Sequence, residues 1–291
     1  MTIIARGHKQ VRNYERALGG EPPRSSLRKS QSDLTRTLTQ RLRKTNADRK
    51  EIAALTKQKQ NLLLKNVSRR DPALKQANAE LERVYAQRAK RKLTRPRIRT
   101  FEPRVISGSN FTIHVPPYDA DWTFNPSGNA ATANKGAGTY DLACQSIGDG
   151  TQEVAAGVMS WFFCTAADPQ QRFAALLDFS DDWWDSASGY VAHNDFRMRL
   201  WVFGHSENAW VHQSDVQPSW SDGVGWFEDH GGSDERRTSA EVFFPARANS
   251  WYQAWVWSDA WVYADSGFWG FAASSIHFSA SVPLMVFGSL F

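Results

Sequence analysis

The segment WYQAWVW, Trp251–Trp257, is the clearest strand in the sequence. β-Branched and aromatic residues favour extended backbone, and successive side chains of a strand point to opposite faces of its sheet. The alternation therefore predicts Trp251, Trp255 and Trp257 on one face. Such a row of indole rings either fills the space between two sheets or stacks on sugar rings, and core packing is the favoured interpretation.

Further strand patterns surround this segment. Met159–Cys164 is apolar on both faces, which is typical of a central strand. Period-two alternation and short runs rich in β-formers predict strands around Phe111–Val115, Thr139–Gln145, Arg172–Phe179, Tyr190–Phe203, Ala209–Gln213, Thr238–Phe244 and Ile276–Val282. Roughly eight to ten strands separated by turns predict an antiparallel β-sandwich, jelly-roll-like, because the helical periods of a parallel doubly wound fold are missing.

The N-terminal third differs sharply in composition. All 13 tryptophans lie between Trp122 and Trp269. Residues 1–104 contain 28 Lys and Arg against 9 Asp and Glu, a net charge of +19, whereas the remainder contains 7 against 21, a net charge of −14. The change indicates two physically different parts, and the overall fold class is α+β by segments.

Helical spacing dominates the basic part from Ser26 onward. An apolar stripe begins at Leu34, and Asp71-Pro72 marks the start of a second helix that ends before Pro96. We therefore expect a helical hairpin or coiled coil, which would be marginal alone. The predicted organisation is a flexible basic arm (1–26), a helical oligomerisation or anchoring segment (27–94), a linker (95–108) and a Trp-rich β-sandwich (109–291).

The basic part is a candidate surface for a polyanion or a partner. The cations singled out for this role are Arg41, Arg43, Lys44, Arg88, Arg91 and Lys92. Non-specific nucleic-acid binding would follow from charge alone, since no base-reading motif is present. A basic arm before an all-β domain also resembles the layout of icosahedral virus coat proteins. A solvated stalk and homo-oligomerisation through the helices remain open alternatives.

The β part offers candidate ligand-binding residues in segments predicted to be loops. Tryptophans lie beside carboxylates in Asp181–Asp185 and in Pro218–Asp234, an arrangement that suits carbohydrate recognition or a protein interface. The predicted ligand-binding residues are Trp183, Trp184, Asp182, Asp185, Trp220 and Trp226. The alternative is that these loops only cover the ends of the sandwich.

No metal or catalytic motif emerges. Two aspartate groups, around Asp178–Asp185 and Asp222–Asp234, lack the spacing of a calcium-binding loop, so a single calcium ion is a minor alternative to turn-capping aspartates and no cofactor is expected. Histidines lack zinc spacing. Cys144 and Cys164 allow at most one disulfide bridge. We expect no enzymatic activity, because no nucleophile elbow, phosphate loop or metalloprotease motif occurs.

The beginning of the chain lacks the basic-then-apolar order of a signal peptide, and no apolar stretch approaches the ~20 residues of a membrane span. We expect cytoplasmic synthesis, followed by release or incorporation into a particle. The sequence as a whole favours a non-enzymatic structural or binding protein, such as a fibre, appendage or particle component. The alternatives are a nucleic-acid-associated coat-like protein and a lectin-like carbohydrate-binding module.

Overall fold

The structure, a computed structural model, describes residues 15–37, 39–40, 111–125, 129–188, 191–225, 227–267 and 270–288. Within these ranges residues 15–19 and 24–37 are helical. The strands are β1 (Phe111–His114), β2 (Ala120–Phe124), β3 (Ala130–Asn134), β4 (Thr139–Ile147), β5 (Gly150–Cys164), β6 (Asp168–Ala187), β7 (Val191–Gly204), β8 (Ala209–Val224), β9 (Glu228–Ala246), β10 (Ser250–Asp265) and β11 (Ala272–Gly288).

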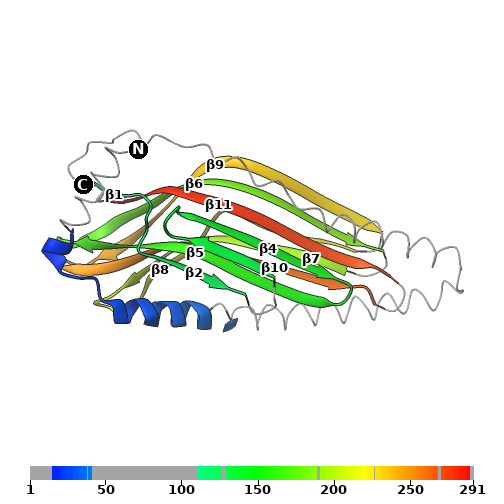
Figure 1. The fold of residues 1–291 in the computed structure, drawn as a ribbon, viewed down its shortest axis with the longest axis horizontal. Helices are drawn as coiled ribbons and strands as arrows, with labels where there is room; N and C mark the ends of the chain where they lie inside the picture. The colour runs from blue at the N-terminus through cyan, green and yellow to red at the C-terminus, as the bar shows by residue number, and fades with distance from the viewer. Residues whose placement is uncertain are drawn as a thin grey trace, which may run out of the picture.

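The strands form two antiparallel sheets (Figure 1). Sheet A has the order β3-β4-β11-β6-β9, with β1 also paired to β11, and sheet B has the order β2-β5-β10-β7-β8. Among strands β4 to β11, β4 pairs with β11, β5 with β10, β6 with β9, and β7 with β8. This is the pairing of one long hairpin rolled into a sandwich, which is the topology of a jelly roll.

The main core lies between the two sheets. In β10 the residues Tyr252, Ala254 and Val256 belong to this core, together with Phe162 of β5 and Phe278 of β11. Trp255 and Trp257 belong to a different cluster, on the opposite face of sheet B. The predicted alternation of β10 is therefore confirmed, but its tryptophans pack on the outer face of sheet B and not between the sheets.

The strands expected from the sequence are all present, although most are longer than expected. The structure adds two short strands, β2 and β3, that the sequence patterns did not indicate. The loops expected at Asp181–Asp185 and Pro218–Asp234 were wrong, because β6 continues through the first segment and β8 and β9 occupy most of the second. Gly232 in β9 allows the Trp183 ring to pack closely against this strand, because a Cβ at Gly232 would lie about 3.1 Å from the ring.

The described N-terminal residues pack on the sandwich. Figure 1 shows helix 24–37, in blue, on the side of sheet B that faces away from sheet A. The described residues 15–26 contact the β-domain through Glu15, Gly19 and Ser26, and the rest of the arm expected over 1–26 lies outside the described residues. Most of the expected helical hairpin, the linker (95–108) and the second helix lie outside the described residues. No described helix is long and apolar enough to cross a membrane.

The two cysteines are free and buried, so the disulfide considered from the sequence does not form. Cys144 lies in β4 and Cys164 lies in β5, in different sheets. Burial raises the pKa of the Cys144 thiol far above its ordinary value and that of Cys164 to about 12. Both side chains act as small apolar core residues.

Candidate functional site

The outer face of sheet B, which we call the indole face, is defined by eight tryptophans. They come from β2, β5, β7, β8 and β10 and are Trp122, Trp161, Trp201, Trp210, Trp251, Trp255, Trp257 and Trp261. One face of an antiparallel sheet is ordinarily solvated, whereas Trp255 and Trp257 here are fully buried. The indole face is therefore a second core, outside the sandwich.

Trp257 organises the centre of the indole face. Its neighbour on β5 is Gly157, whose missing side chain leaves room for the indole. The ring meets Trp122 edge-on at a centroid separation of 5.8 Å and Trp201 at 4.9 Å. Edge-to-face pairs of this kind add to the stabilisation from burial.

A buried arginine crosses this aromatic surface. Arg199 of β7 is 1% exposed, and its guanidinium donates to Asp259 (Nε to Oδ1, 2.5 Å) and to Asp215 (Nη1 to Oδ1, 2.9 Å). It also lies 4.9 Å from the Trp257 ring centroid, within range of a cation–π contact. The two carboxylates and the indole compensate the charge that burial would otherwise penalise.

Burial also affects a carboxylate on this face of sheet B, that of Glu153. Burial and the negative charge of Asp259 raise the pKa of Glu153 on β5 to about 8. Glu153 lies opposite Trp261 in the pairing of β5 with β10. This end of the indole face therefore changes charge in the range of neutral pH.

Helix 24–37 lies against the other end of the indole face. Its buried positions recur every fourth residue at Ser26, Ser30 and Leu34, the spacing of one helical face. Leu34 packs in the tryptophan cluster. The Ser26 hydroxyl contacts His205 Nδ1 at 2.5 Å, and the Ser30 hydroxyl donates to Gln253. The small serines allow a close approach, and their hydrogen bonds fix the position of the helix along the sheet.

The preceding turn is also attached to the sheet. Trp251 Nε1 donates to the carbonyl oxygen of Gly19 at 3.0 Å. A Cβ at Gly19 would lie 2.5 Å from the Phe163 ring, so glycine permits this approach. The segment 15–37 thus makes specific contacts with β5 and β10.

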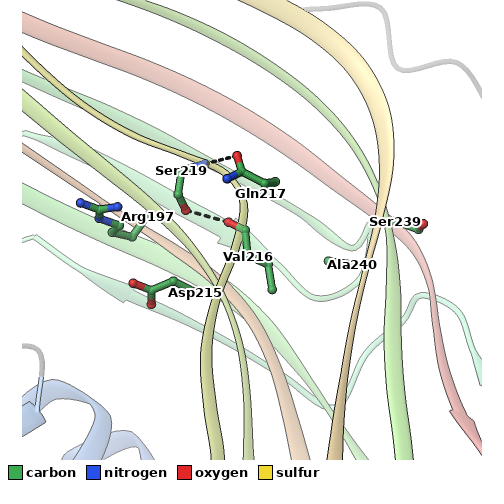
Figure 2. Close-up of a pocket in the computed structure, with 7 residues that line it drawn as sticks. All are labelled: Arg197, Asp215, Val216, Gln217, Ser219, Ser239 and Ala240. Atoms are coloured by element: carbon green, nitrogen blue, oxygen red, sulfur yellow. Dashed lines mark hydrogen bonds between the residues drawn. The ribbon is translucent and has the colours of Figure 1, made fainter.

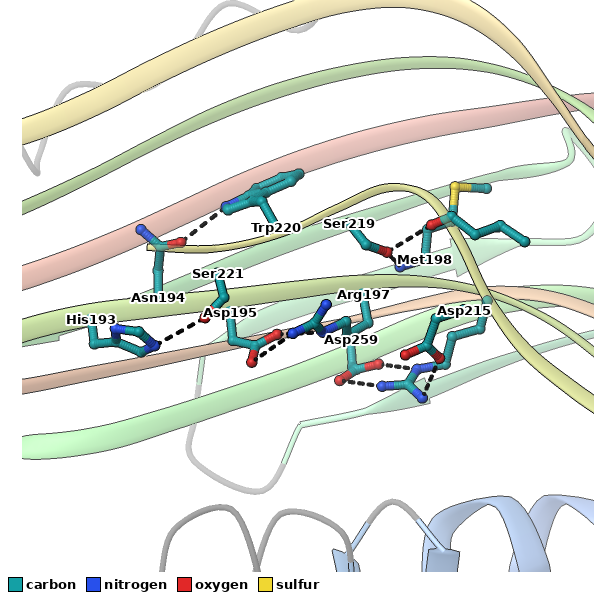
Figure 3. Close-up of polar contacts among 12 residues, drawn as sticks. His193, Asn194, Asp195, Arg197, Met198, Asp215, Ser219, Trp220, Ser221 and Asp259 are labelled. Carbon is teal, nitrogen blue, oxygen red and sulfur yellow. Dashed lines mark hydrogen bonds and ion pairs between the residues drawn. The ribbon is translucent and has the colours of Figure 1, made fainter. Parts of the chain in front are cut away.

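A polar strip lies along β7 and β8 (Figure 3). Arg197 pairs with Asp195 at 2.8 Å, and Ser221 Oγ lies 3.1 Å from His193 Nε2. His193, Asp195, Arg197 and Arg199 occupy alternate positions of β7 and face away from the inter-sheet core, and Ser221 lies opposite Asp195 on β8. The strip supplies both hydrogen-bond donors and acceptors at the edge of sheet B.

A surface pocket of about 430 Å³ opens beside this strip (Figure 2), which we call the bulge pocket. It is lined by Arg197, Asp215, Val216, Gln217, Ser219, Ser239 and Ala240. In the pairing of β7 with β8, Ser219 lies opposite Arg197 and Val216 lies opposite Met198, so Gln217 and Pro218 are extra residues on β8. This bulge brings polar side chains to the gap between β8 and β9.

The structure separates the predicted ligand-binding residues of β6. Asp185 is fully buried and accepts a hydrogen bond from Asn194 at 2.6 Å, and Trp183 packs against the inter-sheet core. Asp182 and Trp184 occupy the alternate positions, on the outer face of sheet A, where Trp184 packs with Phe271. Period two divides these four neighbours between two faces, so they do not form one surface.

Trp220 lies near Asp185 inside the sandwich. Its ring stacks on Phe196 at 4.3 Å and its Nε1 donates to Asn194 Oδ1 at 2.9 Å. Burial raises the pKa of Asp185 to about 8. Trp226 lies outside the described residues, as do all six predicted polyanion-binding residues, Arg41, Arg43, Lys44, Arg88, Arg91 and Lys92.

A serine, a histidine and a glutamate meet at the base of the N-terminal segment. His114 Nδ1 lies 2.5 Å from Ser160 Oγ, and His114 Nε2 lies 3.1 Å from Glu15 Oε2. The set has the residue types of a nucleophilic triad. However, Ser160 and His114 are fully buried, and Ser160 donates to Asp119. This burial gives a substrate no access to the hydroxyl, and the contacts join residue 15 to β1 and β5.

Among the described residues no group of three or more His, Cys, Asp or Glu side chains is placed to hold a metal ion. The aspartates considered for calcium are distributed along β6, β8 and β9. Asp178 forms an ion pair with Arg237, and Asp181 accepts a hydrogen bond from the backbone N–H of Asp234.

The sequence analysis did not identify Arg197, Arg199 and Asp215, which form ion pairs on the outer face of sheet B. Charged residues at alternate positions of an apolar strand are typical of a solvated face, so the pattern itself gave no sign of a buried ion pair. The available signal was the density of tryptophans in β10, the strand that pairs with β7, which is higher than one inter-sheet core requires.

No family model matches the sequence, and a search of curated proteins finds no match. A search of solved structures finds weak similarity to several chains. A family 61 carbohydrate-binding module in complex with β-1,4-galactotriose is 11% identical over 62% of this chain and 90% of its own, with a TM-score of 0.16. A family 11 module from Clostridium thermocellum is 9% identical over 63% and 99% (TM-score 0.17), and a tailspike of bacteriophage CBA120 is 12% identical over 60% and 19% (TM-score 0.17). Similarity this low carries no inference about function.

Proposed function

We propose that this chain is a non-enzymatic structural or binding protein. Its basic N-terminal segment mediates self-assembly or anchoring in a larger assembly, and its jelly roll is a head that recognises a ligand or partner. The observation that carries the proposal is the position of helix 24–37 on the indole face, where Ser26, Ser30 and Leu34 are buried.

The buried face of helix 24–37 attaches residues 15–37 to the head. A free linker would leave this helix independent of the head, whereas hydrogen bonds from Ser30 to Gln253 and from Trp251 to Gly19 fix the position of helix 24–37 on sheet B. A fixed orientation is what a structural component of an ordered assembly requires.

The charge distribution supports contacts between copies. The side of helix 24–37 that faces away from the sheet carries the exposed cations Arg24, Arg28, Lys29 and Arg36. Residues 105–291 carry a net charge of −14, so the acidic head of a neighbouring copy is a complementary surface.

Light scattering across a salt series tests self-assembly. We expect oligomers or particles at about 50 mM salt and smaller species near 1 M, because the Debye length falls to about 3 Å. The double variant Arg24→Glu/Arg28→Glu should weaken assembly. The control Lys135→Glu/Arg236→Glu changes the charge equally on the sandwich and should not. A monomer at low salt and high concentration would refute self-assembly.

The same cations support polyanion binding as a second candidate function. A row of arginines and lysines along one helix neutralises phosphates without reading sequence. Co-purifying nucleic acid and an affinity that falls steeply with salt would favour this candidate over contacts between heads. The charge-reversal variant is cleaner here than deletion of residues 1–99, because deletion would also uncover the indole face.

A further inference from the structure

The bulge pocket differs from the indole face in being open. Asp215, Gln217 and Ser239 are exposed, and the pocket lies at the β8 edge of sheet B, next to β9. Its volume of about 430 Å³ falls within the usual range for small-molecule sites, about 300–1,000 Å³. A ligand can therefore reach it while helix 24–37 stays in place.

We propose that the bulge pocket binds a neutral, polyhydroxylated ligand, that is, a saccharide unit. The inference gives a ligand class to the recognition role proposed for the head and rests on that role. It does not depend on self-assembly through the N-terminal segment.

The backbone of the pocket is held in place by its own side chains. Ser219 Oγ accepts a hydrogen bond from the Met198 N–H at 3.2 Å and donates to the Val216 carbonyl at 2.7 Å (Figures 2 and 3). The Ser219 N–H donates to Gln217 Oε1 at 3.2 Å. Pro218 is buried and has no N–H to leave unpaired. These bonds fix the bulge, so a ligand meets a preformed rim.

The charges of the pocket are internally compensated. Arg197 forms an ion pair with Asp195, and Asp215 forms one with Arg199. A phosphate or an ammonium group would have to compete with these pairs for its counter-charge. The pocket therefore favours a ligand without net charge.

The remaining groups match the surface of a sugar ring. Arg197 offers donors, Asp215 offers acceptors, and the Gln217 amide offers both, which suits hydroxyl groups that donate and accept. Val216 and Ala240 supply apolar surface for the C–H groups of a ring. Polar groups around a small apolar patch are the combination that a polyhydroxylated ring requires.

Calorimetric titration of the full-length chain tests the proposal. The probes are cellotetraose, β-1,4-galactotriose and mannotriose, with trigalacturonic acid as an anionic counterpart. We expect at least one neutral oligosaccharide to bind, and Gln217→Ala to weaken its binding at least tenfold. The matched control Gln213→Ala changes an exposed residue of β8 outside the pocket and should alter the affinity less than twofold.

Three results would overturn the inference: no neutral probe binds at 10 mM, binding is equal in pocket and control variants, or only the anionic probe binds. All substituted residues are exposed, so circular dichroism should show the fold unchanged. Light scattering on the same samples separates the outcomes. Saccharide binding by a monomer would refute self-assembly alone, and assembly without saccharide binding would refute the bulge pocket alone.

Discussion

The two outer faces of the sandwich are built differently. On sheet A the outer positions of β6 and β9 carry exposed ion pairs, Arg172 with Glu241 and Arg237 with Asp178. On sheet B the corresponding surface carries eight tryptophans and the buried Arg199. The outer face of sheet A is the solvated face expected of an antiparallel sandwich. The outer face of sheet B is instead a packing surface, on which helix 24–37 lies.

This difference indicates that the outer faces of the two sheets contribute unequally to the stability of the fold. Cross-strand ion pairs in water contribute little, whereas indole burial contributes in proportion to the apolar area removed from water. Sheet B is therefore stabilised on both faces and sheet A mainly on one. Four substitution experiments test this contrast.

The largest expected effect separates a buried arginine from an exposed one. Arg199→Met should lower the free energy of unfolding by about 3–5 kcal/mol, because Asp259 then stays buried without the guanidinium. The control Arg237→Met removes the exposed pair with Asp178 and should cost less than about 1 kcal/mol. Urea denaturation measures both. Equal losses would show that the two faces are energetically alike.

The close packing of the indole face gives the next effect. An added Cβ at Gly157 would overlap the Cβ of Trp257 and lie 2.5 Å from the Val256 carbonyl oxygen. Gly157→Ala should therefore lower the free energy of unfolding by about 1–3 kcal/mol and change the tryptophan fluorescence spectrum. Gly136→Ala, whose nearest neighbour is the Asn134 side chain, is the control. A Gly157→Ala protein as stable as the control would contradict the tight packing of this face.

A pH titration tests the part of the indole face that contains Glu153. The Glu153 pKa is about 8 in the folded chain and about 4.3 in an unfolded one. Between these values only the folded state holds the proton, so the free energy of unfolding falls as pH rises and levels above pH 8. With allowance for solvent screening the change is on the order of 1 kcal/mol.

Glu153→Gln should reduce this dependence between pH 5 and 8 without abolishing it, because the raised pKa of Asp185 gives a dependence of the same sign. Glu241→Gln on sheet A should leave the dependence unchanged. Urea denaturation at pH 5, 6.5 and 8 provides the measurement. The assignment to Glu153 fails if its glutamine variant keeps the slope of the unsubstituted chain.

The smallest effect tests the contact of the helix with the indole face. Ser30→Ala removes the hydrogen bond to Gln253 and should cost about 0.5–1 kcal/mol. Ser32→Ala, at an exposed position of the same helix, corrects for the higher helix propensity of alanine. Hydrogen exchange of the Trp251 indole N–H should quicken only in Ser30→Ala. Unchanged exchange in both variants would argue against the observed position of the helix.

Sequence reasoning predicted the strands other than β2 and β3, but it did not predict which residues form the outer surfaces. Alternation in β10 correctly grouped Trp251, Trp255 and Trp257, yet it could not show that Tyr252, Ala254 and Val256 face the other sheet. The bulge pocket could not be predicted either. Its lining residues come from β7, β8 and β9, and the register shift at Gln217 depends on how β8 pairs with β7.

The sequence alone determined the division into a cationic N-terminal part and a tryptophan-rich β part, and the period-two strands of a sandwich. These are local properties, carried by composition and by side chains at fixed spacing along the chain. Only the tertiary structure decided that helix 24–37 covers sheet B, that Arg199 is buried among indoles, and that the predicted site residues of β6 lie on two faces. Those outcomes depend on which strand faces of distant segments meet, and spacing along one segment carries no information about its partner.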